Sequence, residues 1–306
     1  MSSPAESPAV APSATAEPCP TPLEWHVVLD EFRRQWRHFV APSHVGTERV
    51  TGVTFGAGTP LYVLGPAAGD CRLFALLAWL LKDDFCCVFV DLPKLGWPVR
   101  GAVELPKLTG AVLSAAAHLG HFQHGVLGVE FGSAVALDLA ANYPNRISSL
   151  VLLQAAAKFS PTWLERGMLA YGSCLPGAIG GIPGWWNLQR QNHRPWFPPF
   201  DDSRFDFLAR TLGESPTSQF SRRMQLRAGL DFSPHLGSIA APTLLVETEG
   251  EGPVIRRGMD QLRAGLPHAQ VESLHSTGLH PYLTHPHRLA KLIRTFVDSV
   301  RVASAN

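Results

Sequence analysis

Gly128-Val129-Glu130-Phe131-Gly132 is the stretch that decides the fold of this 306-residue chain. The apolar residues Val126 and Leu127 precede it, and the small-residue run 133–137 follows it. An apolar run that meets closely spaced glycines and then a helix-forming segment is typical of a buried strand that turns sharply into a helix. The sequence therefore predicts a strand–turn–helix unit with Glu130 at its turn.

Strand-like and helix-like segments alternate on both sides of this unit. Predicted strands cover 49–55, 61–64, 85–90, 125–129, 147–153, 243–246 and 270–274, and predicted helices cover 24–40, 73–82, 108–119, 132–142, 254–266 and 286–300. Continuous apolar strands that alternate with helices favour a mostly parallel sheet covered by helices on both faces. We therefore expect an α/β fold whose core comprises residues 22–155 and 237–306.

Residues 156–236 interrupt this alternation and are rich in Pro, Gly and Trp. An insertion of this size after a sheet strand predicts a helical cap over the carboxyl edge of the sheet, where open α/β sheets bind their ligands. Its aromatic side chains could line an apolar pocket or form the small core of the cap itself. These two interpretations do not exclude each other.

Composition excludes several classes of partner. The net charge is +1, so no overall field favours nucleic acid or an anionic membrane. The basic pairs Arg33-Arg34, Arg222-Arg223 and Arg256-Arg257 are interpreted as solvated helix faces. The longest apolar run, Leu73 to Leu81, is about half a membrane span.

The five cysteines include no Cys-x-x-Cys pair, which favours a reduced, cytoplasmic protein. Residues 1–21 are rich in Pro, Ala and Ser and lack the basic and apolar regions of a signal peptide. They are predicted to form a disordered tail.

Three motifs together resemble the α/β-hydrolase superfamily over about residues 45–300. They are the turn around Glu130 with its following helix, Pro242-Thr243-Leu244-Leu245-Val246, and the segment from Gly278 to Pro286. The resemblance implies the α/β-hydrolase fold with a helical cap insertion. It also implies a triad in the order nucleophile, acid and histidine, together with an oxyanion hole.

Glu130 stands where the superfamily usually has a serine nucleophile. A carboxylate can attack carbon and form an ester intermediate, but Glu is one methylene longer than the Asp found in some members. Ser133 lies in the first turn of the helix and does not replace the missing serine. Glu130 is therefore either a carboxylate favoured by the helix N-terminus or a binding or catalytic group.

The other site positions also depart from the resemblance. The acid position falls on Glu251, with Glu249 as the alternative in the same loop. The superfamily histidine position falls on Leu279, so His280 is displaced by one residue. Gly65-Pro66 replaces the usual His-Gly, which leaves the N–H groups of Ala67 and Phe131 as the oxyanion hole. An anionic Glu130 could itself occupy that hole.

Metal and cofactor sites are not expected. His118, His121 and His124 recur every third residue, but Gly120 and Gly125 indicate that the helix ends among them. Glu130, Glu251 and His280 could together suit Mn, Fe or Zn, although no local spacing supports such a site.

The combined departures predict a non-hydrolytic member that binds a small apolar molecule under the cap, or a protein partner. Two short runs, Pro60 to Gly69 and Thr277 to Leu283, also resemble maspardin, a branch that lacks the superfamily histidine and is associated with protein binding. The alternative is an active hydrolase of ester-like substrates that uses Glu130 with Glu251 and His280. A scaffold protein with an exposed aromatic cap is the third possibility.

Overall fold

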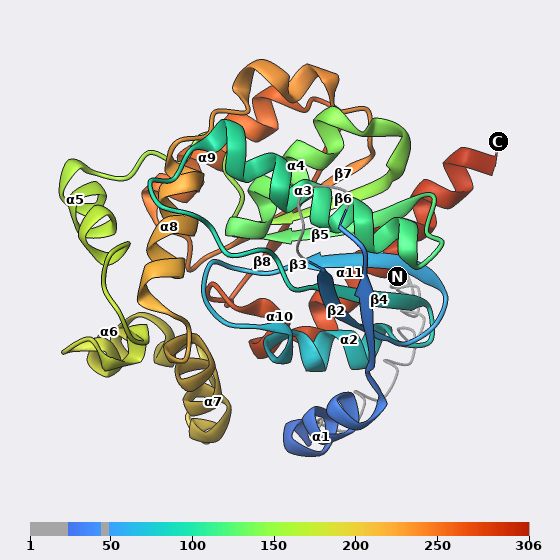
Figure 1. The fold of residues 1–306 in the computed structure, drawn as a ribbon. Helices are drawn as coiled ribbons and strands as arrows, with labels where there is room; N and C mark the ends of the chain where they lie inside the picture. Colours follow the sequence, from blue (N-terminus) through green and yellow to red (C-terminus); the bar gives the residue numbers. More distant parts are fainter. Residues whose placement is uncertain (1–23, 44–48, 306) are drawn as a thin grey trace, which may run out of the picture.

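The computed structural model describes residues 24–43 and 49–305, so the predicted tail at 1–21 lies outside the described residues. An eight-stranded sheet with the order β1-β2-β4-β3-β5-β6-β7-β8 forms its centre (Figure 1). Strands β3 to β8 pair in parallel, whereas β1 and β2 pair antiparallel at one edge. The strands are β1 Arg37–Ala41, β2 Val50–Phe55, β3 Thr59–Leu64, β4 Phe85–Val90, β5 His124–Val129, β6 Ile147–Leu153, β7 Thr243–Thr248 and β8 Gln270–Leu274.

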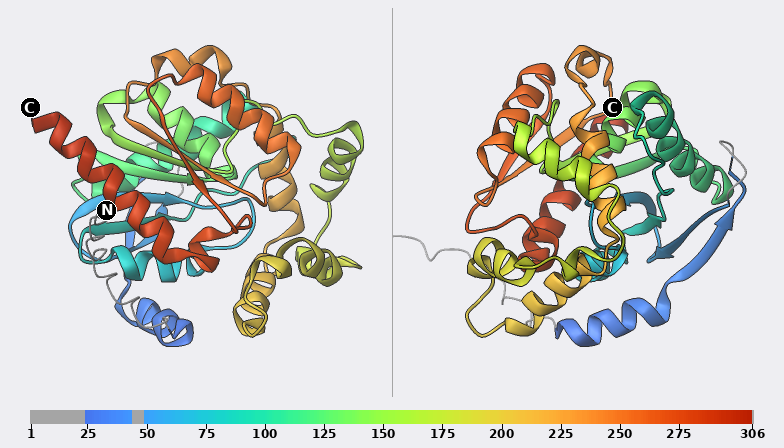
Figure 2. Two further views of the ribbon diagram at one scale, coloured as in Figure 1. Left: turned by 180° about the vertical axis from the view of Figure 1, so that it is seen from behind. Right: turned by 60° about the vertical axis from the view of Figure 1, so that its left-hand side comes forward.

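Helices cover both faces of the sheet and divide the core into two layers. One layer holds α1, α2 and α11, and α11 crosses this face in the rear view (Figure 2). The other layer holds α3, α4 and α9. Alternate residues of β3 supply the two layers, since Leu61 and Val63 belong to the first and Tyr62 and Leu64 to the second. The predicted α/β-hydrolase fold, a mostly parallel sheet flanked by helices, is confirmed.

The helices of the core are α1 Trp25–Gln35, α2 Ala75–Leu81, α3 Gly101–His118, α4 Phe131–Asn142, α9 Pro253–Gly265, α10 Pro281–Thr284 and α11 Pro286–Ala305. Short 3₁₀ turns are η1 Cys71–Phe74, η2 Pro144–Arg146, η3 Ile179–Gly181, η4 Arg194–Trp196 and η5 Ser233–Ser238. Along residues 24–43 and 49–305, no helix combines the length and apolar character that crossing a membrane requires.

The prediction of one helix over residues 24–40 is wrong in its last five residues. Helix α1 ends at Gln35, and Trp36 adopts an extended conformation. Residues 37–41 then form the edge strand β1, which buries Phe39 and Ala41 on alternate positions against the rest of the sheet. The apolar residues keep a helix-like spacing into residues 37–41, although these residues form a strand, in which side chains alternate with a period of two.

Four helices lie between β6 and β7 and are called the α5–α8 insertion. They are α5 Trp163–Gly172, α6 Trp185–His193, α7 Asp202–Gly213 and α8 Thr217–Ala228. Helices α5 to α7 stand away from the sheet, whereas α8 runs back towards it (Figure 1).

The turn between β5 and α4 depends on a close approach of two backbones. The N–H of Gly132 donates to the carbonyl of Gly65 at 3.0 Å. A Cβ atom at Gly132 would collide with the carbonyl oxygens of Leu64 and Gly65. Glycine is therefore required here because the loop after β3 lies directly against the start of α4.

Replacing this glycine should test how strongly the turn fixes the fold. Gly132→Ala is expected to lower the free energy of unfolding by roughly 4 kcal/mol or more, because backbone must move to admit the methyl group. Gly167→Ala in α5 is the matched control, since its Cβ would meet nothing within 4 Å. It should be neutral or stabilising by up to about 1 kcal/mol. Urea unfolding of both variants measures the difference, and equal stabilities would contradict the close approach.

Candidate functional site

Glu130 occupies the sharp turn between β5 and α4 in a strained backbone conformation. Its φ is 52° and its ψ is −104°, outside the regions that most side chains adopt. The N–H of Glu130 donates to the carbonyl of Leu153 at the end of β6. The turn therefore holds the side chain of Glu130 at the carboxyl edge of the sheet, as a nucleophile elbow does.

Both carboxylate oxygens of Glu130 have partners. Oε2 accepts a hydrogen bond from the N–H of Ala67 at 2.6 Å, and Oε1 accepts one from Nη1 of Arg227 at 3.2 Å. Ala67 lies in the loop after β3, and Arg227 lies in α8 of the insertion. Of the two predicted oxyanion donors, Phe131 follows Glu130 in the sequence, and the N–H of Ala67 is already engaged by the Glu130 carboxylate.

Arg227 is the residue that sequence reasoning missed. Only 4% of its surface is exposed, and its Nη2 also donates to the carbonyl of Gln154 at 2.6 Å. Its guanidinium lies 4.6 Å from the ring centroid of Phe159. Burial lowers the pKa of Arg227, whereas the charges of Glu130 and Glu251 oppose that shift. Arg227 is thus a buried cation within electrostatic range of two carboxylates.

Arg223, a second arginine of α8, contacts the loop of Ala67, and the prediction of a solvated face at Arg222-Arg223 is wrong. Arg222-Arg223 was interpreted as part of a solvated face, but Nη1 of Arg223 donates to the carbonyl of Ala67 at 3.2 Å. Its guanidinium also lies 5.7 Å from the ring centroid of Phe131. Arg222 donates to the carbonyls of Leu95 and Ser173. This pair binds backbone carbonyls because α8 packs against the core rather than facing water.

The two glutamates proposed for the acid position differ in their surroundings. Glu251 is buried after β7, and burial raises its pKa to about 7, while the backbone of Thr248 lowers it in part. Its Oε1 has no hydrogen-bond partner among the described residues. Glu249 is half exposed and lies 3.2 Å from Nδ1 of His275. Only Glu251 is close enough to act electrostatically on Arg227.

His280 does not join this group. Its Nδ1 lies 2.6 Å from the hydroxyl oxygen of Tyr282, and its ring centroid lies 4.8 Å from that of His193. Its Nε2 is buried and lacks a hydrogen-bond partner among the described residues. Burial lowers the pKa of His280 well below its ordinary value, and His193 adds to this effect. The carbonyl oxygen of the neighbouring Leu279 accepts a hydrogen bond from the side-chain amide of Gln154.

The metal possibilities find no support in the arrangement. In the described part of the chain, no three His, Cys, Asp or Glu side chains gather as a metal site would require. The Glu130 carboxylate accepts from the guanidinium of Arg227. Of the histidines spaced by three, His118 ends α3, whereas His121 and His124 both pack against the ring of Tyr62. Nδ1 of His121 lies 2.9 Å from the hydroxyl of Tyr62.

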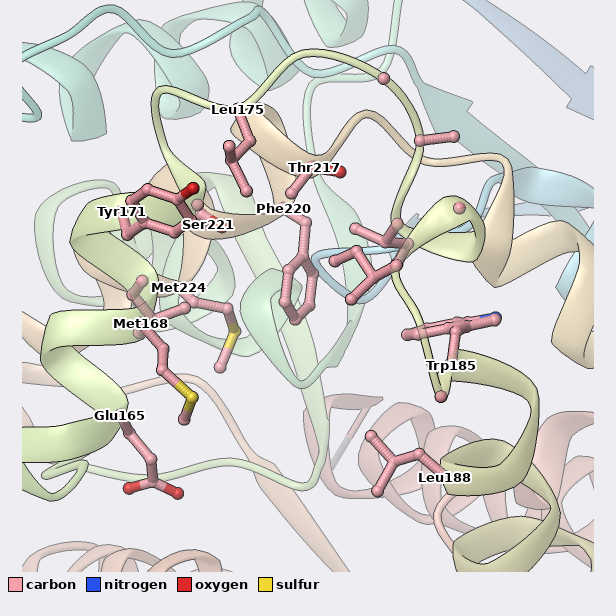
Figure 3. A pocket seen from close by; sticks show the side chains of 18 of the residues that line it. Glu165, Met168, Tyr171, Leu175, Trp185, Leu188, Thr217, Phe220, Ser221 and Met224 are labelled. Atoms are coloured by element: carbon pink, nitrogen blue, oxygen red, sulfur yellow. The ribbon is translucent and has the colours of Figure 1, made fainter.

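A cavity of about 1050 Å³ lies within the α5–α8 insertion (Figure 3). Met168 and Tyr171 of α5 form one wall, Trp185 and Leu188 of α6 form the other, and Phe220 of α8 projects between them (Figure 3). Neither Glu130 nor Ala67 belongs to its lining. Phe197 and Phe205 of the insertion lie 5.8 Å apart and belong to the same buried cluster as α1, α2 and α11. Aromatic residues of the insertion therefore line the cavity and also join one layer of the sheet core.

Comparison with known proteins identifies the family of this chain. The sequence profile of the alpha/beta hydrolase family matches residues 56–292. A pimeloyl-[acyl-carrier protein] methyl ester esterase of Methylococcus capsulatus is 28% identical over 233 residues, which cover 72% of this chain and 87% of the esterase.

Solved structures share the fold at low sequence identity. A thermophilic esterase of Thermogutta terrifontis has a TM-score of 0.72 and 15% identity, covering 86% of this chain and 99% of its own. An enol-lactonase of Burkholderia xenovorans has a TM-score of 0.68 and 16% identity, covering 85% of this chain and 100% of its own.

Removing Arg227 should expose the cost of burying Glu130. Arg227→Met is expected to lower the free energy of unfolding by about 3–5 kcal/mol, because it leaves a largely buried carboxylate without its cation. The double variant Glu130→Gln/Arg227→Met should recover much of that loss. Chemical unfolding of the wild type, both single variants and the double variant measures the coupling, and simple additivity would show that the pair does not interact.

The raised pKa of Glu251 predicts a specific pH dependence of stability. Folded Glu251 keeps its proton up to about pH 7, whereas its ordinary pKa is 4.5. At Glu251 the folded state therefore binds more protons between these values, so the contribution of this residue to stability should fall as the pH rises from about 4.5 to 7, by at most about 1.4 kcal/mol per pH unit. Buried histidines such as His280, whose pKa is lowered, contribute in the opposite direction below their ordinary pKa of 6.5.

Urea unfolding between pH 4.5 and 8 checks this dependence. Glu251→Gln should remove this negative contribution and make the slope of stability against pH more positive in this window, whereas Glu249→Gln should leave the slope unchanged because that side chain is exposed. An identical slope in the wild type and Glu251→Gln would refute the assignment.

Proposed function

Because this chain belongs to the alpha/beta hydrolase family, we propose that it keeps the family fold without the hydrolytic reaction and binds a small apolar molecule. The observation that carries this proposal is the position of the Glu130 carboxylate between the Ala67 N–H and the Arg227 guanidinium.

An attacking carboxylate needs an oxygen that is free to reach the substrate carbon. Both oxygens of Glu130 accept hydrogen bonds, one of them from a buried cation. The Ala67 N–H, which would stabilise a substrate oxyanion, is occupied by the same carboxylate. The Glu130 side chain therefore occupies the oxyanion-binding position that hydrolysis would need.

A glutamyl ester intermediate would also need a base that activates water. His280 is turned towards Tyr282 and His193, with no hydrogen bond to Glu130 or Glu251 among the described residues. Arg227 instead donates to Glu130 and lies within electrostatic range of Glu251, and a guanidinium stays protonated in proteins. Among the described residues, no histidine is hydrogen-bonded to Glu130 to act as that base.

The cavity in the α5–α8 insertion favours a small molecule over a protein partner. Its walls are mostly apolar, and its volume of about 1050 Å³ lies at the upper end of the usual range for ligand sites. On this proposal the insertion acts as a cap that contains its own binding space. We also infer a reducing compartment such as the cytoplasm, since Cys71, Cys86, Cys87 and Cys174 are free thiols.

One observation favours the alternative of an active ester hydrolase. A Glu251 pKa of about 7 suits a group that exchanges protons near neutral pH. That function would require Arg227 to withdraw from Glu130, so that the carboxylate could attack or could activate water.

Hydrolysis of p-nitrophenyl acetate and p-nitrophenyl octanoate separates the two functions. Wild-type protein is expected to release p-nitrophenol at the rate of buffer alone, without a burst. Glu130→Gln, which keeps the shape of the side chain, should not change this rate, and Glu249→Gln serves as the matched control. Turnover or a burst that Glu130→Gln abolishes, and Glu249→Gln preserves, would establish Glu130 as catalytic and overturn the proposal.

A further inference from the structure

The charge of the cavity lining disfavours ligands that carry a negative charge. Glu165 is the one charged side chain in the lining, and neither Lys nor Arg contributes to it. Its Oε2 accepts from the N–H of Thr162 at 2.7 Å and from the Thr162 hydroxyl at 2.8 Å, which keeps the carboxylate at the start of α5. A ligand anion would meet a like charge and no counter-charge, and burying a charge without a partner is costly.

Two hydroxyl groups provide a polar contact inside this apolar space. Thr217 and Ser221 lie one turn apart on α8, so they share a helix face, and both residues are only 4% exposed. Among the described residues, neither hydroxyl makes a hydrogen bond, and neither oxygen is fully buried. The Ser221 Oγ packs against Gly172 of α5. A ligand oxygen near this part of the wall could bond to these hydroxyls, since a hydroxyl donates and accepts.

The remaining walls suit a long, flexible or flat apolar body. Met168 of α5 and Met224 of α8 have adaptable side chains, while Trp185 and Phe220 present broad rings (Figure 3). Tyr171 is 70% exposed and Met168 is 57% exposed, so large apolar side chains stand uncovered at the mouth. An occupant that covers them would remove this apolar surface from water.

We propose that the cavity binds an elongated, uncharged apolar molecule with a hydroxyl or carbonyl oxygen, and that this oxygen meets Thr217 and Ser221. This inference rests on the proposed function and specifies the ligand of the same cavity. It predicts preference for a long-chain alcohol over the carboxylate of equal chain length.

Displacement of the fluorescent probe N-phenyl-1-naphthylamine from the full chain at pH 8 tests this preference. 1-Tetradecanol is expected to displace the probe at a concentration about 10-fold or more below that of tetradecanoate. Thr217→Val and Ser221→Ala should each weaken tetradecanol binding about five-fold without changing probe binding. Ser218→Ala, on the same helix but outside the lining, is the matched control.

A charge-addition variant tests the same inference without removing any contact to the hydroxyls. Leu188 is 51% exposed, so Leu188→Arg should fold and supply the missing cation at the wall. It should strengthen tetradecanoate binding about 10-fold relative to tetradecanol. Asn187→Arg adds the same charge to α6 outside the lining and should leave the ratio unchanged.

The possible outcomes separate this inference from the proposed function. Equal or tighter binding of tetradecanoate by the wild type would overturn the inference and leave a ligand-binding protein. Unchanged tetradecanol affinity in both hydroxyl variants would do the same. Failure of the probe, the alcohol and the carboxylate to bind at all would overturn the proposed function as well.

Discussion

The carboxylate of Glu130 needs partners because most of its side chain is buried, and this requirement connects three parts of the molecule. The turn after β5 carries the carboxylate, the loop after β3 supplies the Ala67 N–H, and α8 supplies the Arg227 guanidinium. A buried ion pair contributes little net stability against an apolar substitute, but leaving one partner unpaired is costly. The pair therefore acts mainly by fixing where α8 lies against the sheet.

The position of α8 in turn fixes the wall between the elbow and the cavity. Arg223 and Arg227, four residues apart, turn towards the elbow, whereas Phe220 and Met224, also four apart, line the cavity. Phe159 lies between the two regions, because it lines the cavity and its ring faces Arg227. The Glu130–Arg227 pair thus supports a helix that lines the cavity, although the Glu130 carboxylate itself is outside the lining.

Features that depend on residues close together in the sequence could be predicted, whereas contacts between residues far apart in the sequence could not. The strand, turn and helix around Glu130 are encoded locally by Gly128 and Gly132, so the fold was predictable. The displacement of His280 was also visible, because it follows from register along one short segment. Arg227 lies 97 residues from Glu130, and no local spacing connects the two.

The errors arose where local polarity or periodicity was read without tertiary context. Arg222-Arg223 resembles a solvated pair, yet its guanidinium groups bind carbonyls of the core. One signal could have identified α8: a carboxylate at a buried turn requires a cation, and two arginines four residues apart in the insertion could supply it. β1 was missed because apolar spacing continued past Trp36, where the backbone had already become extended.

The strained turn at Glu130 is held in place by the residues around it. A non-glycine residue at φ 52° costs on the order of 1–3 kcal/mol and survives only where its surroundings determine it. Those surroundings are backbone contacts: the N–H of Glu130 on Leu153, the N–H of Gly132 on Gly65, and the absence of a Cβ at Gly132. None of them involves the side chain at the turn. Because the elbow is built by its neighbours, its presence identifies the fold without identifying a reaction.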